Sequence, residues 1–231
     1  MIKAILFDKD GTLFDFGATW EAWAVSFLLR AAKGNHTRAT RIGHHIGFDM
    51  TTRRFRPDSV AIAGTPGEVA EALLPHFPEE QADAFLDMLN GEAAAAPQAE
   101  AVPLEPFLDG LAARGLTLGV MTNDSEEVAH AHLGEAGILD RFAFVAGFDS
   151  GYGAKPMPEP LLAFCAAVDV SPAETVMVGD STHDLIAGRR AGMGTIGVLT
   201  GMAQSETLTP YADAVFPDIG HLPGWLDRNA S

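Results

Sequence analysis

Short apolar runs alternate with longer amphipathic stretches along most of the chain. Each run is only a few residues long and mostly lacks polar alternation, a pattern typical of strands covered on both faces of a parallel sheet. The expected strands are Ile2–Phe7, Leu116–Met121, Phe142–Ala146, Thr175–Val178, Thr195–Leu199 and Ala214–Phe216. The expected helices between them are Pro106–Arg114, Glu126–Ala136, Pro158–Val168 and Thr182–Ala191. This order predicts an α/β fold, in which helices flank a Rossmann-like parallel sheet core.

The segment between the first two expected strands breaks this rhythm. Its apolar residues recur at helical spacing from Trp20 to Ala31, and again near Glu79–Asn90. The stretch Thr65-Pro66-Gly67-Glu68 combines an N-cap, a proline at the first helical position and a capping-box glutamate, so a helix is expected to begin there. We therefore predict an inserted all-helical cap over residues 17–91, with residues 1–16 and 92–231 forming the sheet-containing core.

Composition narrows the classes of partner. Of the 231 residues, 47% are hydrophobic and 20% charged, which excludes wholesale disorder. Lys and Arg total 15 against 31 Asp and Glu, and the net charge of −16 repels phosphate backbones and anionic lipid at long range. We therefore expect neither a nucleic acid nor a membrane as partner, and the sequence leaves the oligomeric state open. The one cysteine, Cys165, is expected to be a buried thiol and fits a cytoplasmic location.

Polar residues follow several of the expected strands. Asp8-Lys9-Asp10-Gly11-Thr12 follows the first, Thr122-Asn123-Asp124 follows the second, and Gly179-Asp180 with Asp184 follows Thr175–Val178. Lys155 precedes the helix at Pro158–Val168. Because ligands of open parallel sheets bind beyond the carboxyl ends of the strands, these groups are expected to converge at one edge. Carboxylates gathered there suit Mg²⁺ together with a phosphate-bearing ligand.

These four motifs resemble, in order, those of the haloacid dehalogenase-like hydrolase superfamily, and among its members the phosphoglycolate phosphatase-like enzymes. The resemblance covers nearly the whole chain, and the predicted helical insert corresponds to the cap of that superfamily. It implies a Mg²⁺-dependent hydrolase that acts on a phosphoric monoester through an aspartyl-phosphate. The expected substrate is a small phosphorylated metabolite, with phosphoglycolate as the leading candidate.

The resemblance also assigns roles to single residues. Asp8 is the expected nucleophile, and Asp10 is the expected general acid and base. The expected metal ligands are Asp8, Asp10 through its backbone carbonyl, Asp180 and Asp184. The expected phosphate-binding residues are Gly11, Thr122, Asn123 and Lys155, with backbone N–H groups contributing near Gly11 and Asn123.

Local capping patterns bear on two of the acids. Ser181-x-x-Asp184 is itself a capping box, so Asp184 is open to a structural role in place of a metal-binding one. Asp124 is expected to cap the helix that follows it, because Asp124-x-x-Glu127 resembles a capping box as well.

The residues that are candidates for determining substrate specificity are Lys9 and three arginines, and two interpretations are open for each. Lys9 stands where the family often has an apolar residue, and it either meets a second anionic group of the substrate or offsets Asp8 and Asp10. Arg53, Arg54 and Arg56 cluster in the predicted cap. One of them pairs with a substrate carboxylate, or all three form a solvated basic patch.

Other reactions remain in view. A carboxylate two positions after the nucleophile, here Asp10, separates phosphate-ester chemistry from that of the dehalogenases, phosphonate hydrolases and ion-pumping ATPases of the superfamily. It does not separate a phosphatase from a phosphomutase of the β-phosphoglucomutase type, which shares all four motifs. A non-catalytic binding relative is a third possibility, against which the intact motif acids argue.

Overall fold

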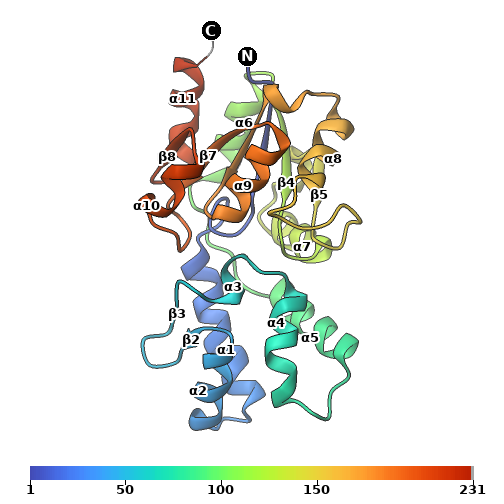
Figure 1. Cartoon of the computed structure of the whole chain (residues 1–231), viewed down its shortest axis with the longest axis vertical. Helices are drawn as coiled ribbons and strands as arrows, with labels where there is room; N and C mark the ends of the chain where they lie inside the picture. Colours follow the sequence, from blue (N-terminus) through green and yellow to red (C-terminus); the bar gives the residue numbers. More distant parts are fainter. Residues whose placement is uncertain (230–231) are drawn as a thin grey trace.

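The six expected strands pair into one parallel sheet in the computed structural model, which describes residues 1–229 (Figure 1). They are β1 (Ala4–Phe7), β4 (Thr117–Met121), β5 (Phe144–Ala146), β6 (Thr175–Gly179), β7 (Gly194–Val198) and β8 (Ala214–Phe216). Their order across the sheet is β5-β4-β1-β6-β7-β8, so β1 lies between β4 and β6. Since all pairings are parallel, the carboxyl ends of the strands share one edge.

Successive side chains of each strand enter hydrophobic layers on opposite faces of the sheet. Ile5 and Phe7 of β1 pack with apolar residues of α6 (Leu104–Ala112), α7 (Glu126–Glu135) and α11 (Leu222–Arg228). Leu6 packs on the other face with α8 (Glu159–Val168) and α9 (Thr182–Ala191). Cys165 of α8 is buried in this second layer, as expected. The helices on both faces confirm the Rossmann-like prediction, and the short helix α10 (Ser205–Leu208) lies between β7 and β8 in the chain.

The segment between β1 and β4 builds a hydrophobic cluster of its own. It contains the π-helical turn Gly17–Glu21, α1 (Ala22–Ala31), α2 (His36–His45), α3 (Val60–Ala63), α4 (Pro66–Leu73) and α5 (Ala82–Ala94). The capping box expected at Thr65 forms, with Glu68 Oε2 accepting from the Thr65 backbone N–H at 2.7 Å. A short antiparallel pair, β2 (Phe48–Asp49) and β3 (Arg54–Phe55), interrupts the helices, so the segment is not entirely helical.

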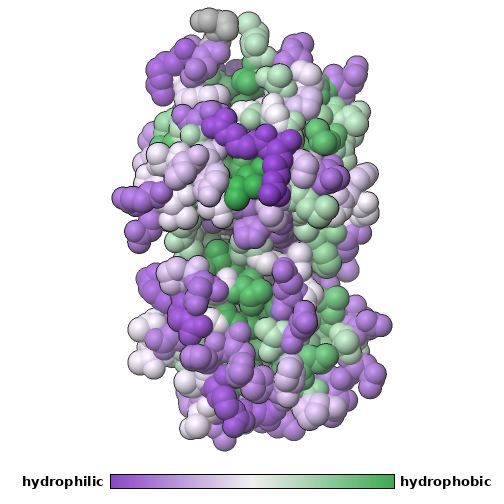
Figure 2. All heavy atoms as spheres, viewed as in Figure 1, coloured by the Kyte–Doolittle hydropathy of each residue, from purple (hydrophilic) through white to green (hydrophobic). Residues whose placement is uncertain are grey.

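Helices α1–α5 lie at one end of the molecule and the sheet at the other, where the N-terminus and α11 also lie (Figure 1). The division at residues 17 and 91 stays a prediction; α5 continues to Ala94, and residues 230 and 231 lie outside the described part. In the space-filling view the molecule narrows between the two ends, and hydrophobic side chains are visible there (Figure 2). No helix in residues 1–229 is long and apolar enough to cross a membrane.

Candidate active site

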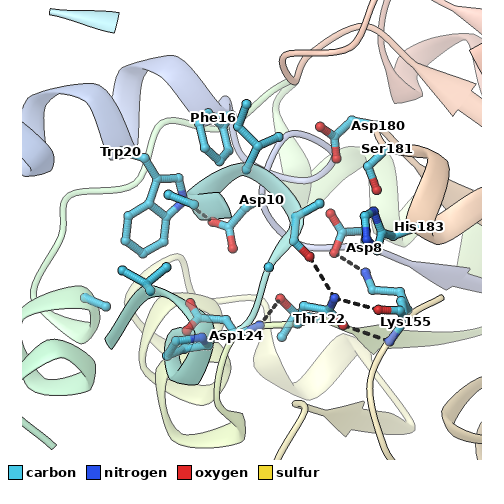
Figure 3. Close-up of a pocket in the computed structure, with 18 of the residues that line it drawn as sticks. Asp8, Asp10, Phe16, Trp20, Thr122, Asp124, Lys155, Asp180, Ser181 and His183 are labelled. Carbon is cyan, nitrogen blue, oxygen red and sulfur yellow. Dashed lines mark hydrogen bonds and ion pairs between the residues drawn. The ribbon is translucent and has the colours of Figure 1, made fainter. Parts of the chain in front are cut away.

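A pocket lies between the carboxyl edge of the sheet and the helical segment. Residues that follow β1, β4 and β6 line it from the sheet side, and residues of α1, α3, α4 and α5 line it from the opposite side. The expected convergence of Asp8, Thr122, Lys155, Asp180 and Asp184 is therefore present. Figure 3 shows Asp8 beside Lys155 and Asp10 beside Trp20.

Asp8, Asp180 and Asp184 form a buried carboxylate cluster. Each offers one oxygen, and these three oxygens lie within 4.8 Å of one another. Burial raises the pKa of both Asp8 and Asp180 above the ordinary aspartate value, and the neighbouring carboxylates of the cluster add to the rise. Three acids held this close without enough positive charge favour the binding of a cation.

Lys155 is the cation of this cluster. Its Nζ lies 2.6 Å from Asp8 Oδ1 and 2.7 Å from Asp184 Oδ1. Burial by itself lowers the pKa of this ammonium, but Asp184 and Asp8 outweigh burial and hold the pKa above its usual range. Lys155 therefore stays charged, and one positive charge faces three carboxylates.

The structure confirms the capping role of Asp184, and its metal-binding role stays a prediction. Its Oδ2 accepts from the Ser181 backbone N–H at 3.0 Å and from Ser181 Oγ at 2.6 Å, which closes the capping box of α9. Its other oxygen, Oδ1, belongs to the carboxylate cluster through Lys155. The capping box of α9 thus fixes the orientation of the Asp184 carboxylate and leaves its Oδ1 directed towards the cluster.

Two glycines allow the loops to approach the cluster. A Cβ on Gly179 would overlap the Asp184 carboxylate, and a Cβ on Gly201 would overlap the carboxylate of Asp180. Gly179 lies in a motif recognised from the sequence. Gly201 follows β7 and was not singled out, because a glycine there carries no local signal of the acid it touches.

Asp10 does not belong to the cluster; its carboxylate is held from two other sides. Oδ1 accepts a hydrogen bond from Trp20 Nε1 at 2.8 Å, and Oδ2 lies 2.5 Å from Lys9 Nζ. Trp20 belongs to the π-helical turn that enters the helical segment. The helical spacing of Trp20 indicated only an apolar face, so sequence reasoning missed this contact with a candidate catalytic acid.

Lys9 is fully buried and is not among the residues that line the pocket. Besides Asp10, its ammonium lies 3.4 Å from Asp124 Oδ2 and 3.0 Å from His132 Nδ1. Burial alone lowers the pKa of Lys9, but Asp10 and Asp124 raise it above the ordinary value, so the ammonium stays charged. This geometry fits the interpretation that Lys9 offsets neighbouring acids; it does not fit a substrate contact.

The expectation that Asp124 caps α7 is wrong. The N-cap is Ser125, whose side chain accepts from the Val128 backbone N–H at 3.3 Å. Asp124 instead directs Oδ2 to Lys9, and burial raises the pKa of Asp124 above its ordinary value although Lys9 opposes the rise. The long-range ion pair competes with the local capping pattern and prevails, because a buried carboxylate needs a cation.

The expected phosphate-binding residues fall into two groups. Thr122 and Lys155 are buried and line the pocket. The Asn123 side chain is already engaged, since its amide group donates to the carbonyls of Lys155 and Ala63 at 2.9 Å each and accepts from the Lys155 backbone N–H at 2.9 Å. The Gly11 backbone N–H donates to the Phe14 carbonyl at 2.7 Å. Asn123 lines the pocket, and phosphate binding by Asn123 stays a prediction, for which its backbone N–H is the candidate donor because the side-chain amide is engaged.

The three arginines Arg53, Arg54 and Arg56 lie at the surface on and beside β3, and none of them lines the pocket within the described chain. Arg56 Nε lies 3.1 Å from Asp58 Oδ1, and the nearest carboxylate contact of Arg54, with Glu21, measures 3.7 Å. These positions fit a solvated basic patch. They do not bring an arginine to the substrate.

The family model for haloacid dehalogenase-like hydrolases matches residues 2–192. The chain belongs to this family. A phosphoglycolate phosphatase from Psychrobacter arcticus is 30% identical over 202 residues, which cover 86% of this chain and 84% of the relative. A pyrophosphatase PpaX from Anoxybacillus flavithermus is 30% identical over 211 residues, covering 91% and 89%.

Among solved structures of similar fold is the β-phosphoglucomutase of Clostridium difficile. It superposes with a TM-score of 0.68 at 19% identity and covers 100% of this chain and 99% of the mutase. At this identity the likeness shows the haloacid dehalogenase-like fold alone. The relatives' names differ in substrate, so the substrate of this haloacid dehalogenase-like hydrolase has to be argued from its own pocket.

Proposed function

We propose that this haloacid dehalogenase-like hydrolase is a phosphatase that hydrolyses a small phosphorylated metabolite through an aspartyl-phosphate. The observation that carries the proposal is the placement of two differently held carboxylates at one pocket. Asp8 lies in the acidic cluster beside Lys155, and Asp10 lies apart between Trp20 and Lys9. The phosphatase names of both relatives support the same reaction class.

The cluster fits a divalent cation, and we propose Mg²⁺. Of the three buried carboxylates, Asp8 and Asp184 pair with the single ammonium of Lys155, and oxygen ligands are those that Mg²⁺ prefers. Asp8, Asp180 and Asp184 are the residues to hold the ion, with the Asp10 backbone carbonyl as a further ligand. When bound, the ion neutralises the carboxylates and lowers the repulsion between an anionic nucleophile and an anionic phosphate.

Asp8 and Asp10 divide the chemistry between them. One Asp8 oxygen bonds to phosphorus while the bond from phosphorus to the leaving-group oxygen breaks, and Asp10 gives that oxygen a proton. In the second step Asp10 takes a proton from water as the water oxygen bonds to phosphorus. The bond between phosphorus and Asp8 breaks, which releases inorganic phosphate and restores Asp8.

Lys155 and Thr122 bind the phosphoryl group during both steps. Lys155 is already 2.6 Å from the Asp8 oxygen, so its ammonium is placed beside the position that the phosphoryl group takes. Positioning and charge neutralisation supply most of the catalysis in phosphoryl transfer. The engaged ammonium thus serves the nucleophile and the substrate with the same charge.

Phosphate release from p-nitrophenyl phosphate with added Mg²⁺ tests the proposal. Wild type should release phosphate, and Asp8→Asn should not, because the amide keeps the shape of the side chain but does not form the acyl phosphate. Asp87→Asn, at an exposed acid of α5, is the matched control and should keep the wild-type rate. A near-wild-type rate for Asp8→Asn would refute the nucleophile assignment.

A further inference from the structure

The wall of the pocket facing the carboxylate cluster is apolar. Its lining side chains come from the helical segment and include Trp20, Trp23, Phe55, Ile62, Val69 and Leu89. Within residues 1–229 no arginine lines the pocket, and Lys155 is the lining lysine. Its charge is already shared between Asp8 and Asp184. His183 also lines the pocket, at the start of α9 on the sheet side.

This wall is unsuited to a second anionic group on the substrate. A carboxylate moved from water onto apolar side chains loses its hydration and gains no paired cation in return, which is strongly unfavourable. The net charge of the chain is −16, and this surplus of acids also disfavours the binding of a second anionic group. By contrast, the transfer of an apolar leaving group from water to the same wall is favourable, because it removes apolar surface from water.

Two polar atoms in the wall limit how apolar the leaving group is. Trp23 Nε1 and Asn90 Oδ1 are buried, and neither has a hydrogen-bond partner in the described chain. Both residues line the pocket. One of these atoms is a donor and the other an acceptor. A hydroxyl on the substrate is both an acceptor and a donor, so its chemistry matches this pair, whereas a carboxylate offers no proton to Asn90.

We infer that the substrate is a phosphate monoester of an apolar alcohol, alkyl or aromatic, bearing at most a neutral polar group such as a hydroxyl. This inference rests on the proposed phosphatase function and names its substrate class. It departs from phosphoglycolate, the candidate suggested by resemblance, because the carboxylate of that compound has no cation to meet in the apolar wall.

A series of straight-chain alkyl phosphates tests the inference on the wild-type protein. Ethyl, propyl, butyl and hexyl phosphate have leaving groups of similar acidity, so differences in kcat/KM report contact with the wall. We expect kcat/KM to rise by about threefold per added methylene until the wall is covered. Phosphoglycolate, compared with propyl phosphate of similar size, should have a kcat/KM lower by at least about tenfold.

Truncation of side chains in the apolar wall should weaken the preference for long over short alkyl phosphates. Ile62→Ala and Val69→Ala each remove apolar surface, so the ratio of kcat/KM for hexyl over ethyl phosphate should fall by about threefold or more. Met88→Ala is the matched control, because Met88 lies on α5 and its side chain is 41% exposed outside the pocket. In Met88→Ala the ratio of kcat/KM for hexyl over ethyl phosphate should equal that of the wild type.

Each result decides for or against the inference. A flat alkyl series, or phosphoglycolate hydrolysed as efficiently as propyl phosphate, overturns the apolar substrate class and leaves the phosphatase proposal standing. Failure to release phosphate from every compound, p-nitrophenyl phosphate included, overturns the proposed function and the inference with it. Phosphate release that grows with chain length supports both.

Discussion

The Lys9 ammonium lies 3.0 Å from His132 Nδ1, and on the far side of the ring His132 Nε2 lies 2.9 Å from the carbonyl oxygen of Ala93. An ammonium has only donors, so Nδ1 accepts and Nε2 carries the proton that it donates to Ala93. The imidazole is therefore neutral, and it connects the lysine beside Asp10 to the last turn of α5. Burial and the nearby Lys9 charge lower the pKa of His132 to about 4.

Acidification should therefore destabilise the protein through His132. The unfolded ring has a pKa of 6.5, so as pH falls the unfolded chain takes up the proton first. The stabilisation is complete above pH 6.5 and is lost progressively towards pH 4, with about 2 kcal/mol lost between pH 7.5 and 5. Urea unfolding at both pH values should show a pH dependence smaller by about that amount in His132→Gln.

The matched control for this prediction is His130→Gln on the same helix. His130 is exposed, with its nearest acid, Glu126, 3.9 Å away. This variant should keep the pH dependence of the wild type. Identical pH dependence in His132→Gln and the wild type would show that the buried ring does not titrate as argued.

Removal of the Lys9 ammonium should destabilise the fold. Lys9→Met leaves Asp10 and Asp124 without their buried cation, and breaking a buried ion pair in this way costs about 3 kcal/mol. Asp124→Asn removes one of the stranded charges, so the double variant should lose less stability than the sum of the two single variants. Urea unfolding of all four proteins measures this coupling, and strict additivity would count against the ion-pair network.

Metal binding should have a signature in thermal stability that is independent of turnover. In EDTA, Asp180→Asn should be more stable than wild type, because it removes one of three crowded carboxylates. At Mg²⁺ ten times its Kd the Tm of the wild type should rise by about 4 °C. Asp180→Asn should show no such rise, and the exposed variant Asp87→Asn should behave as wild type. If the Tm of the wild type does not change when Mg²⁺ is added, the proposed metal site is contradicted.

Gly201 should be intolerant of even one added methyl group. A Cβ there would overlap the Asp180 carboxylate, so Gly201→Ala has to displace the acid or the loop after β7. We expect a loss of Mg²⁺ affinity of about tenfold or more, measured by the Mg²⁺ dependence of Tm. Gly110→Ala in α6, where a Cβ meets nothing within 4 Å, is the control and should be neutral or slightly stabilising. Equal metal affinity in both variants would remove Gly201 from the site.

The sequence by itself determined the sheet and the acids at its edge. Apolar runs buried on both faces are readable without a partner, and residues such as Asp8, Thr122 and Asp180 directly follow strands whose ends parallel pairing brings together. The Thr65 capping box was equally readable, because its donors and acceptors lie within three residues.

Only the tertiary structure decided what the remaining side chains contact. Lys9 and His132 are 123 positions apart, and no periodicity or spacing in the chain records such a pair. Asp124 pairs with Lys9 and does not cap the helix that the local pattern indicated. The clustered arginines lie at the surface, where Arg56 pairs with Asp58. The apolar wall opposite Asp8 arises from helices whose spacing reveals that a face is buried. Which faces meet at the pocket depends on how the helical segment packs over the sheet, and packing is a property of distances between residues remote in the chain.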